Sequence, residues 1–303
     1  MNKAESIRIN EDRVCRFRRI ADGGFRLAIE VTGRCNLSCK HCFVRPSQNH
    51  PATDEIIGII RQAERLNCRK LIITGGEPLM REDLEQIISE AASLGILADL
   101  NSNLYDLTRG RACGLKAAGL KEASVSLYGV GCFHDELTGR KGSFDRALNG
   151  IDLLREAGIT VDVHGAVWDK MLPCIHDLID TAQKHGVSSI TFFSLIPTET
   201  WGDMGEYIVS PDLALKAVLQ ERQSASMPIR TIGLRKIEND ECTMGNDVYG
   251  VGTDMRLVPC LLSRHRNNET GVDLRVHSVP KAMSLLETRI KKGEWHRACC
   301  SNV

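Results

Sequence analysis

The sequence predicts an α/β protein built on a parallel sheet, arranged as a partial (β/α)6 barrel followed by a small C-terminal module. Short apolar, β-rich segments alternate with segments of helical spacing, the alternation yields six strands, and it stops after about residue 228. Alternation of this kind favours a parallel sheet covered by helices. Six strand–helix units suit an open barrel better than a closed barrel of eight.

Each element follows from its own pattern along the chain. The first strand, FRLAIEVT, is short, apolar and β-rich, and KLIITGG runs into a glycine turn. The helical segments carry apolar residues at helical spacing, and the one that ends at Gly158 stops at a residue that favours helix termination. Strands are therefore expected at residues 25–32, 70–76, 96–103, 122–129, 159–167 and 188–196. Helices are expected at residues 52–66, 82–94, 106–118, 144–157, 174–186 and 210–225.

Three segments of the chain are expected. Residues 1–20 form an N-terminal extension, residues 21–228 the barrel, and residues 229–303 the cysteine-containing module. The motifs whose side chains could bind a ligand or take part in a reaction lie where the first four strands end. This is the edge at which α/β barrels carry their active sites.

Composition limits the partners and the compartment. The chain has 303 residues with 39 basic and 39 acidic side chains, so no global field attracts nucleic acid and none is expected as a partner. No apolar run reaches membrane-spanning length, and the first residues lack a secretion signal. A cytoplasmic protein is expected. Because thiols stay reduced there, metal ligation explains the twelve cysteines better than disulfides do.

Three cysteines lie within eight residues after the first strand, at Cys35, Cys39 and Cys42. Soft thiolates favour iron–sulfur clusters or zinc. A structural zinc site normally has four protein ligands. Only three cysteines are local here, and His41 lies awkwardly between two of them, so an iron–sulfur cluster with one open iron is the better interpretation. Unrelated thiols or a zinc knuckle are the alternatives.

The spacing Cys-x3-Cys-x2-Cys, followed by Phe43, resembles the radical S-adenosylmethionine (SAM) superfamily, whose fold is a partial TIM-like barrel. The resemblance implies that the three cysteines hold a [4Fe–4S] cluster whose open iron binds the amino and carboxylate groups of SAM. It implies reductive cleavage of SAM to a 5′-deoxyadenosyl radical, which takes a hydrogen atom from the substrate. By the same resemblance, Phe43 packs beside the adenine.

Gly75-Gly76-Glu77-Pro78 matches the second motif of the family. Two glycines allow close approach of a ligand, Glu77 can accept from an ammonium group, and Pro78 stiffens the turn. An ordinary glycine turn is the alternative for this motif by itself.

Further positions match the family less specifically. Ser102 and Asn103 end the third strand, where Leu104 replaces the usual glycine. Ser126 matches a serine near the SAM ribose or carboxylate, and a guanidinium at Arg140 suits the SAM carboxylate. Leu195 is placed against the adenine by resemblance. A turn residue, a solvated charge and a core residue are the respective alternatives for Ser126, Arg140 and Leu195.

The C-terminal module carries four further candidate ligands: Cys242, Cys260, Cys299 and Cys300. The stretch from Gly245 to Cys260 resembles the hairpin of the SPASM and twitch extensions, which hold an auxiliary [4Fe–4S] cluster. Adjacent cysteines rarely ligate one metal together, so Cys299 or Cys300 is idle in this interpretation. Free thiols are the alternative.

The leading functional hypothesis is a radical SAM oxidoreductase that oxidises or crosslinks a C–H position, in the maturation of a ribosomally made peptide. The first alternative is a dehydrogenase or epimerase of a small molecule such as a sugar, aminocyclitol or nucleotide, with Cys132 returning a hydrogen atom. The second is a non-catalytic iron–sulfur protein. A reductase such as flavodoxin or ferredoxin is the expected electron donor, and the tail is expected to cap the barrel mouth.

Overall fold

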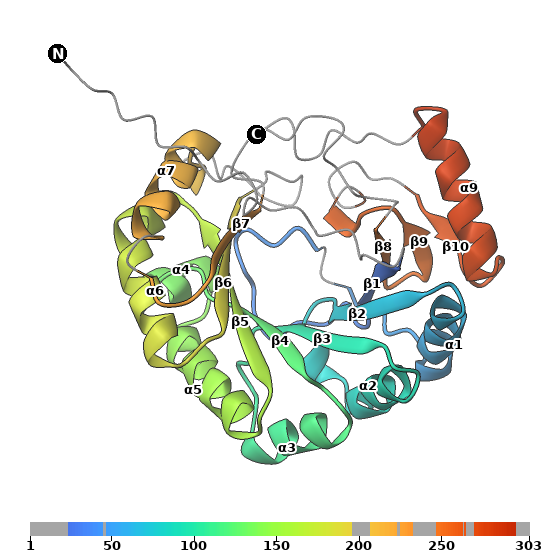
Figure 1. Cartoon of the computed structure of the whole chain (residues 1–303), viewed down its shortest axis with the longest axis horizontal. Helices are drawn as coiled ribbons and strands as arrows, with labels where there is room; N and C mark the ends of the chain where they lie inside the picture. The colour runs from blue at the N-terminus through green and yellow to red at the C-terminus, as the bar shows by residue number, and fades with distance from the viewer. Residues whose placement is uncertain are drawn as a thin grey trace.

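The computed structural model describes residues 24–44, 47–195, 207–222, 225–232, 247–262, 264 and 270–294. In these residues the strands form one sheet in the order β10-β9-β8-β1-β2-β3-β4-β5-β6-β7 (Figure 1). The two end strands, β10 and β7, do not pair with each other, so the sheet curves but does not close. The predicted α/β class and open partial barrel are confirmed.

The barrel half of the sheet is parallel throughout. Its strands are β1 (Phe25–Glu30), β2 (Cys68–Thr74), β3 (Leu97–Ser102), β4 (Glu122–Ser126), β5 (Thr160–Val167), β6 (Ser189–Ser194) and β7 (Ile229–Ile232). Each pairs in parallel with its sequence neighbour, so the carboxyl ends of the strands meet at one edge. β7 is a seventh strand beyond the six that the alternation predicts, because four residues are too few to show a pattern.

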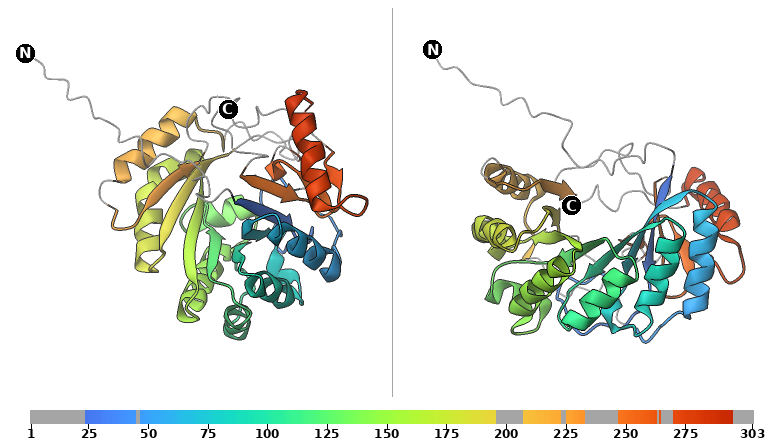
Figure 2. Two further views of the ribbon diagram at one scale, coloured as in Figure 1. Left: turned by 45° about the vertical axis from the view of Figure 1, so that its right-hand side comes forward. Right: turned by 60° about the horizontal axis from the view of Figure 1, so that its bottom comes forward.

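Helices cover the outside of the curved sheet, as Figures 1 and 2 show from three sides. The helical elements of this part of the chain are α1 (Thr53–Glu64), η2 (Pro78–Met80), α2 (Leu84–Ser93), α3 (Arg109–Ala117), α4 (Cys132–Thr138), α5 (Ser143–Glu156), η3 (Asp169–Cys174), α6 (Ile175–Lys184) and α7 (Pro211–Glu221). The spacing of the buried side chains explains why these helices pack on the sheet. In α1 the buried residues Ile56, Ile59, Ile60 and Ala63 recur at three and four positions, so one stripe faces the sheet.

The described part of the tail continues the same sheet. β8 (Val248–Val251) pairs in parallel with β1, and β9 (Arg256–Val258) returns antiparallel to β8, where the sequence predicts a hairpin. β10 (Val272–Asp273) follows β9, and α9 (Val279–Lys291) packs against α1 and β9. The division of the chain at residue 228 stays a prediction, and β7 to β10 all belong to the one sheet.

Among the described helices, none combines the length and the apolar composition needed to cross a bilayer. The predicted N-terminal extension, residues 1–20, lies outside the described residues.

Candidate active site

A cavity of about 270 Å³ lies at the carboxyl ends of the barrel strands. Its wall comes from the segments that follow β1, β2 and β3, from the ends of β4, β5 and β6, and from α4 and the segment after β9. The structure brings together most of the residues that the sequence singled out: Cys35, Cys39, Cys42, Phe43, Gly75, Gly76, Glu77, Ser102, Asn103, Ser126 and Leu195.

The three cysteines lie on the loop between β1 and α1. The loop is closed on itself, because Gly33 N donates to Asn49 O at 2.8 Å. It is also fastened to α4, since Lys40 N donates to Leu137 O at 2.8 Å. The loop therefore has a defined backbone path on both sides of the cysteines.

The two glycines of the GGEP turn lie against the backbone of the cysteine loop. Gly75 has a φ of 144°, and a Cβ at either glycine would overlap a backbone oxygen, that of Thr32 or of Arg34. The amide groups of Gly76 and Glu77 donate to those same oxygens, at 2.7 and 2.8 Å. The close approach that the glycines permit is thus between the two motifs themselves, and it holds Glu77 beside the cysteines.

Of the described residues in the cavity wall, Glu77 is the one with an acidic side chain, and it is 1% exposed. Its Oε1 accepts from Ser102 Oγ at 2.7 Å and from Leu79 N at 2.9 Å, and its Oε2 accepts from Asn103 N at 2.8 Å. Burial raises the pKa of the Glu77 carboxyl, and the three donors oppose that shift. A buried carboxylate held in this way is suited to bind a cationic group.

Asn103 connects the third strand to the cysteine loop. Its Nδ2 donates to Asn36 Oδ1 at 2.9 Å and lies 4.0 Å from Cys35 Sγ. The Ser102 hydroxyl and the Asn103 amide therefore both orient Glu77, and the Asn103 side chain contacts the loop that carries the first cysteine.

Burial raises the pKa of all three thiols, that of Cys35 to about 11. Neighbouring thiols and Glu77 add to the rise at Cys35 and Cys39. Without metal the thiols are therefore protonated at neutral pH, and binding of iron releases their protons.

The donor set suits a cubane cluster with one open iron. Each thiolate of a cubane binds a different iron atom, and the cavity wall contains three cysteines among the described residues. In the described part of the chain, no three His, Cys, Asp or Glu side chains are gathered as ligands of a single metal ion.

Besides Cys260 of the tail, three described residues that were predicted for the site do not line the cavity. Pro78 is buried as the first residue of η2, next to Glu77. Arg140 is exposed; its guanidinium donates to Asn36 O at 2.7 Å and lies 4.0 Å from the centre of the Tyr105 ring. Cys132 is exposed at the start of α4. Trp168 also stays out of the cavity wall: it is fully buried and its Nε1 donates to Tyr128 O.

The cavity also contains residues that the sequence did not single out as site residues: Asn101, Tyr128, His134, His164 and Leu262. Asn101 and His164 were accessible to pattern reasoning, because strand alternation places them on the inner face of β3 and β5. Leu262 offered no such signal, since it lies far along the chain from the motifs.

Of the four candidate ligands in the tail, one is described. Cys260 is 6% exposed and directly follows β9 and Pro259. Cys242, Cys299 and Cys300 lie outside the described residues.

An open parallel barrel with three thiols and one buried carboxylate around a cavity at its strand ends defines the class of iron–sulfur barrel proteins that bind SAM. Residues 29–172 match the family model of the Radical SAM superfamily. The chain carries a radical SAM domain, and the cofactors of that family are a [4Fe–4S] cluster and SAM.

Similarity to known proteins spans several activities. The chain is 30% identical over 191 residues to an AdoMet-dependent heme synthase of Oleidesulfovibrio alaskensis, across 61% of this chain and 49% of that protein. It is 28% identical over 293 residues to a probable GTP 3′,8-cyclase of Methanosarcina acetivorans, across 86% of this chain and 83% of that protein. The chain thus spans about half the length of the heme synthase.

Among solved structures, SuiB of Streptococcus suis bound to its precursor peptide SuiA has the same fold. The TM-score is 0.74 at 17% identity, across 87% of this chain and 64% of the SuiB chain.

Proposed function

We propose that this chain is a radical SAM enzyme that binds SAM in the cavity and starts radical chemistry at a C–H bond of its substrate. One observation carries the proposal: the three cysteines and the buried Glu77 line a single cavity. The motif spacing and the family match support it independently.

A [4Fe–4S] cluster and SAM, when bound here, would supply reductive cleavage of SAM and the radical that removes a hydrogen atom from the substrate. The residues of the chain bind and orient. Cys35, Cys39 and Cys42 would hold the cluster, and Glu77 would accept from the amino group of SAM. Phe43 and Leu195 would pack on the adenine, and Ser126 would contact the ribose or the carboxylate of SAM.

A peptide is the first candidate substrate, with oxidation or crosslinking as the outcome. Support comes from the shared fold with SuiB, whose structure contains a precursor peptide. A small molecule is the second candidate, favoured by the similarity to proteins named for heme synthesis and GTP cyclisation. A short precursor peptide encoded beside this chain would favour the first candidate.

We further propose an auxiliary [4Fe–4S] cluster held by Cys260 with Cys242 and Cys299 or Cys300, and an external electron donor such as flavodoxin or ferredoxin. The auxiliary cluster would take up the electron of the substrate radical. Iron analysis tests it. About eight irons per chain are expected with two clusters, and about four in a Cys242→Ala, Cys260→Ala variant.

Anaerobic reconstitution with iron, sulfide, a reductant and SAM tests the central proposal. Formation of 5′-deoxyadenosine and methionine is expected from the wild-type chain and not from a Cys39→Ala variant. A Cys113→Ala variant is the matched control, because that thiol is exposed on α3. A reconstituted wild-type chain that leaves SAM intact would falsify the enzyme function.

A further inference from the structure

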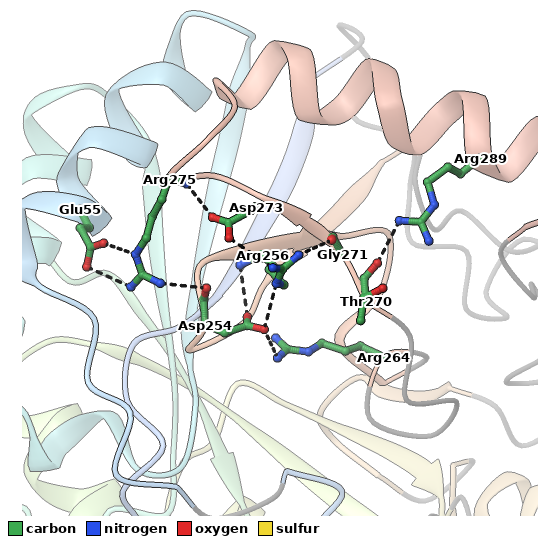
Figure 3. Close-up of polar contacts among 9 residues, drawn as sticks. All are labelled: Glu55, Asp254, Arg256, Arg264, Thr270, Gly271, Asp273, Arg275 and Arg289. Atoms are coloured by element: carbon green, nitrogen blue, oxygen red, sulfur yellow. Dashed lines mark hydrogen bonds and ion pairs between the residues drawn. The ribbon is translucent and has the colours of Figure 1, made fainter.

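The turn between β8 and β9 is held by a network of arginine and carboxylate side chains, with Asp254 at its centre (Figure 3). The carboxylate of Asp254 pairs with Arg264 at 2.8 Å and accepts from the backbone amide of Arg256 at 3.2 Å. Its backbone carbonyl accepts from Arg275, which also pairs with Glu55 of α1 at 2.6 Å. Asp254 thus joins Arg264 to the turn and, through Arg275, to the barrel.

The guanidinium of Arg264 packs directly on Gly252. A Cβ at Gly252 would overlap the Nη1 atom of Arg264. The Arg264 side chain is 18% exposed and that of Asp254 is 34% exposed, so their ion pair is partly shielded from water. Shielding strengthens the attraction between the two charges relative to a surface pair.

Arg264 lies one helical turn after Cys260, since Arg264 N donates to Cys260 O at 3.1 Å. Between them, Leu261 packs on Gly250, where a Cβ would lie 2.6 Å from its Cγ. Leu262 is the next residue, and it lines the same cavity as the three cysteines. The turn is therefore fastened at its middle by β8 and at its end by Asp254.

We propose that Arg264 and Asp254 are positioning residues for the SAM pocket: they hold the 260–264 turn so that Leu262 forms an apolar part of the wall. This inference rests on the proposed function, in that the cavity binds SAM. Leu262 lies outside residues 29–172, so the tail completes a pocket that the radical SAM domain leaves unfinished on that side. Adenine is the apolar, planar part of SAM, and it would use this contact together with Phe43 and Leu195.

The test compares SAM affinity in four forms of the full-length chain with its cluster: wild type, Arg264→Met, Leu262→Ala and the double variant. Equilibrium dialysis without reductant keeps SAM intact. Each single substitution is expected to raise the Kd by roughly tenfold. The double variant should bind no more weakly than the Leu262→Ala variant, because both changes remove the same wall contact. The spectrum of the cluster should be unchanged, and Arg264→Lys should recover part of the affinity.

Arg289→Met is the matched control, because Arg289 bonds Thr270 O at the far side of the network. It should bind SAM as the wild type does. Asp254→Asn provides a second variant in case Arg264→Met unfolds, and it should also weaken SAM binding. Wild-type SAM affinity in folded Arg264→Met and Asp254→Asn variants would overturn the proposal. Losses of SAM affinity that add in the Arg264→Met, Leu262→Ala double variant would overturn it as well. A wild-type chain that acquires a cluster but does not bind SAM would instead contradict the proposed function.

Discussion

Two buried charged side chains, Glu77 and Arg81, organise the candidate site at the scale of single residues. Arg81 is 1% exposed, and its Nη1 donates to Val31 O at 2.7 Å and to Pro51 O at 2.9 Å. Those carbonyls stand at the two ends of the cysteine loop. Arg81 Nη2 pairs with Asp83 at 2.7 Å, which balances the buried charge. One guanidinium therefore closes the loop that Glu77 faces.

Replacing Glu77 with Gln should weaken SAM binding while leaving the cluster in place. A hydrogen bond to a charged group contributes about 1.5–3 kcal/mol, so the Kd should rise roughly tenfold to a hundredfold. Equilibrium dialysis with the reconstituted chain measures the change. Glu82→Gln is the control, because Glu82 is exposed a few residues away. Equal affinity in the Glu77→Gln variant and the wild type would remove Glu77 from the SAM site.

Replacing Arg81 with Met should destabilise the fold and loosen the cysteine loop. The change leaves two buried carbonyl groups and Asp83 without their partner, so the free energy of unfolding should fall by about 3–5 kcal/mol. Urea unfolding measures this loss, and iron analysis should show poorer cluster retention. Arg109→Met is the matched control, because its pair with Glu156 is exposed and such pairs contribute about 0–1 kcal/mol. Similar losses in both variants would contradict the special role of Arg81.

At the scale of elements, α5 begins beside the site and is capped by a side chain from α4. The N-cap residue, Gly142, has no side chain to accept a hydrogen bond. The side chain of Asp135 takes the place of an N-cap side chain. The Asp135 carboxylate accepts from Gly142 N at 2.6 Å and from Phe144 N at 2.9 Å. The cap fixes the turn that carries Arg140, and it sets the angle between the two helices.

Burial opposes ionisation of Asp135, but hydrogen bonds from the amides of Phe144 and Gly142 and from the Ser143 hydroxyl, together with the nearby His134, hold the pKa of the carboxyl below its ordinary value. Because the folded state lowers this pKa, the cap stabilises the fold fully above the unfolded-state value near 3.9 and loses its effect as pH falls through the folded value. Asp135→Ala should lower the free energy of unfolding at pH 7 by about 1–2 kcal/mol.

Urea titrations at pH 7 and at pH 3 measure this contribution. The difference between Asp135→Ala and the wild type should shrink at the lower pH. Asp145→Ala is the control, since Asp145 is exposed on the same helix. A difference that stays constant with pH would show that the carboxylate charge is not what caps α5.

At the scale of the whole molecule, the tail and the barrel share one sheet. β8 pairs with β1 along Arg26 to Ile29, so the described tail covers the edge of the strand that leads into the cysteine loop. Thr253, in the turn after β8, also donates to Glu30 at the end of β1. The site and the tail are therefore coupled through β1.

A chain that ends at residue 246 should lose solubility and stability, because β1 becomes an exposed edge strand. Size-exclusion chromatography should show aggregates, and the urea midpoint should fall. Arg275→Met is the milder comparison: it cuts the exposed pair with Glu55 and the exposed hydrogen bond to Asp254 O but keeps β8, so it should change stability by about 1 kcal/mol or less. A monomeric shortened chain with an unchanged midpoint would instead indicate a separate module after residue 228.

Sequence patterns predicted those parts of the site whose residues lie close together in the chain. The three cysteines share a single loop, and Glu77 follows a glycine turn, so spacing alone suggested their chemistry. Arg140 and Cys132 were harder, because the direction of a side chain near a helix end depends on packing. In the fold, Arg140 contacts the cysteine loop and Tyr105, and Cys132 is exposed.

The alternation of strands and helices by itself determined the open parallel barrel, and the cysteine spacing determined the radical SAM class. Both signals are contained in short stretches of chain, where the period of the apolar residues and the spacing of the metal ligands can be read directly. Only the tertiary structure decided that Arg81 closes the cysteine loop, that β8 extends the sheet at β1, and that Leu262 reaches the cavity. These contacts join residues far apart in sequence, and their positions depend on how the whole sheet curves and packs.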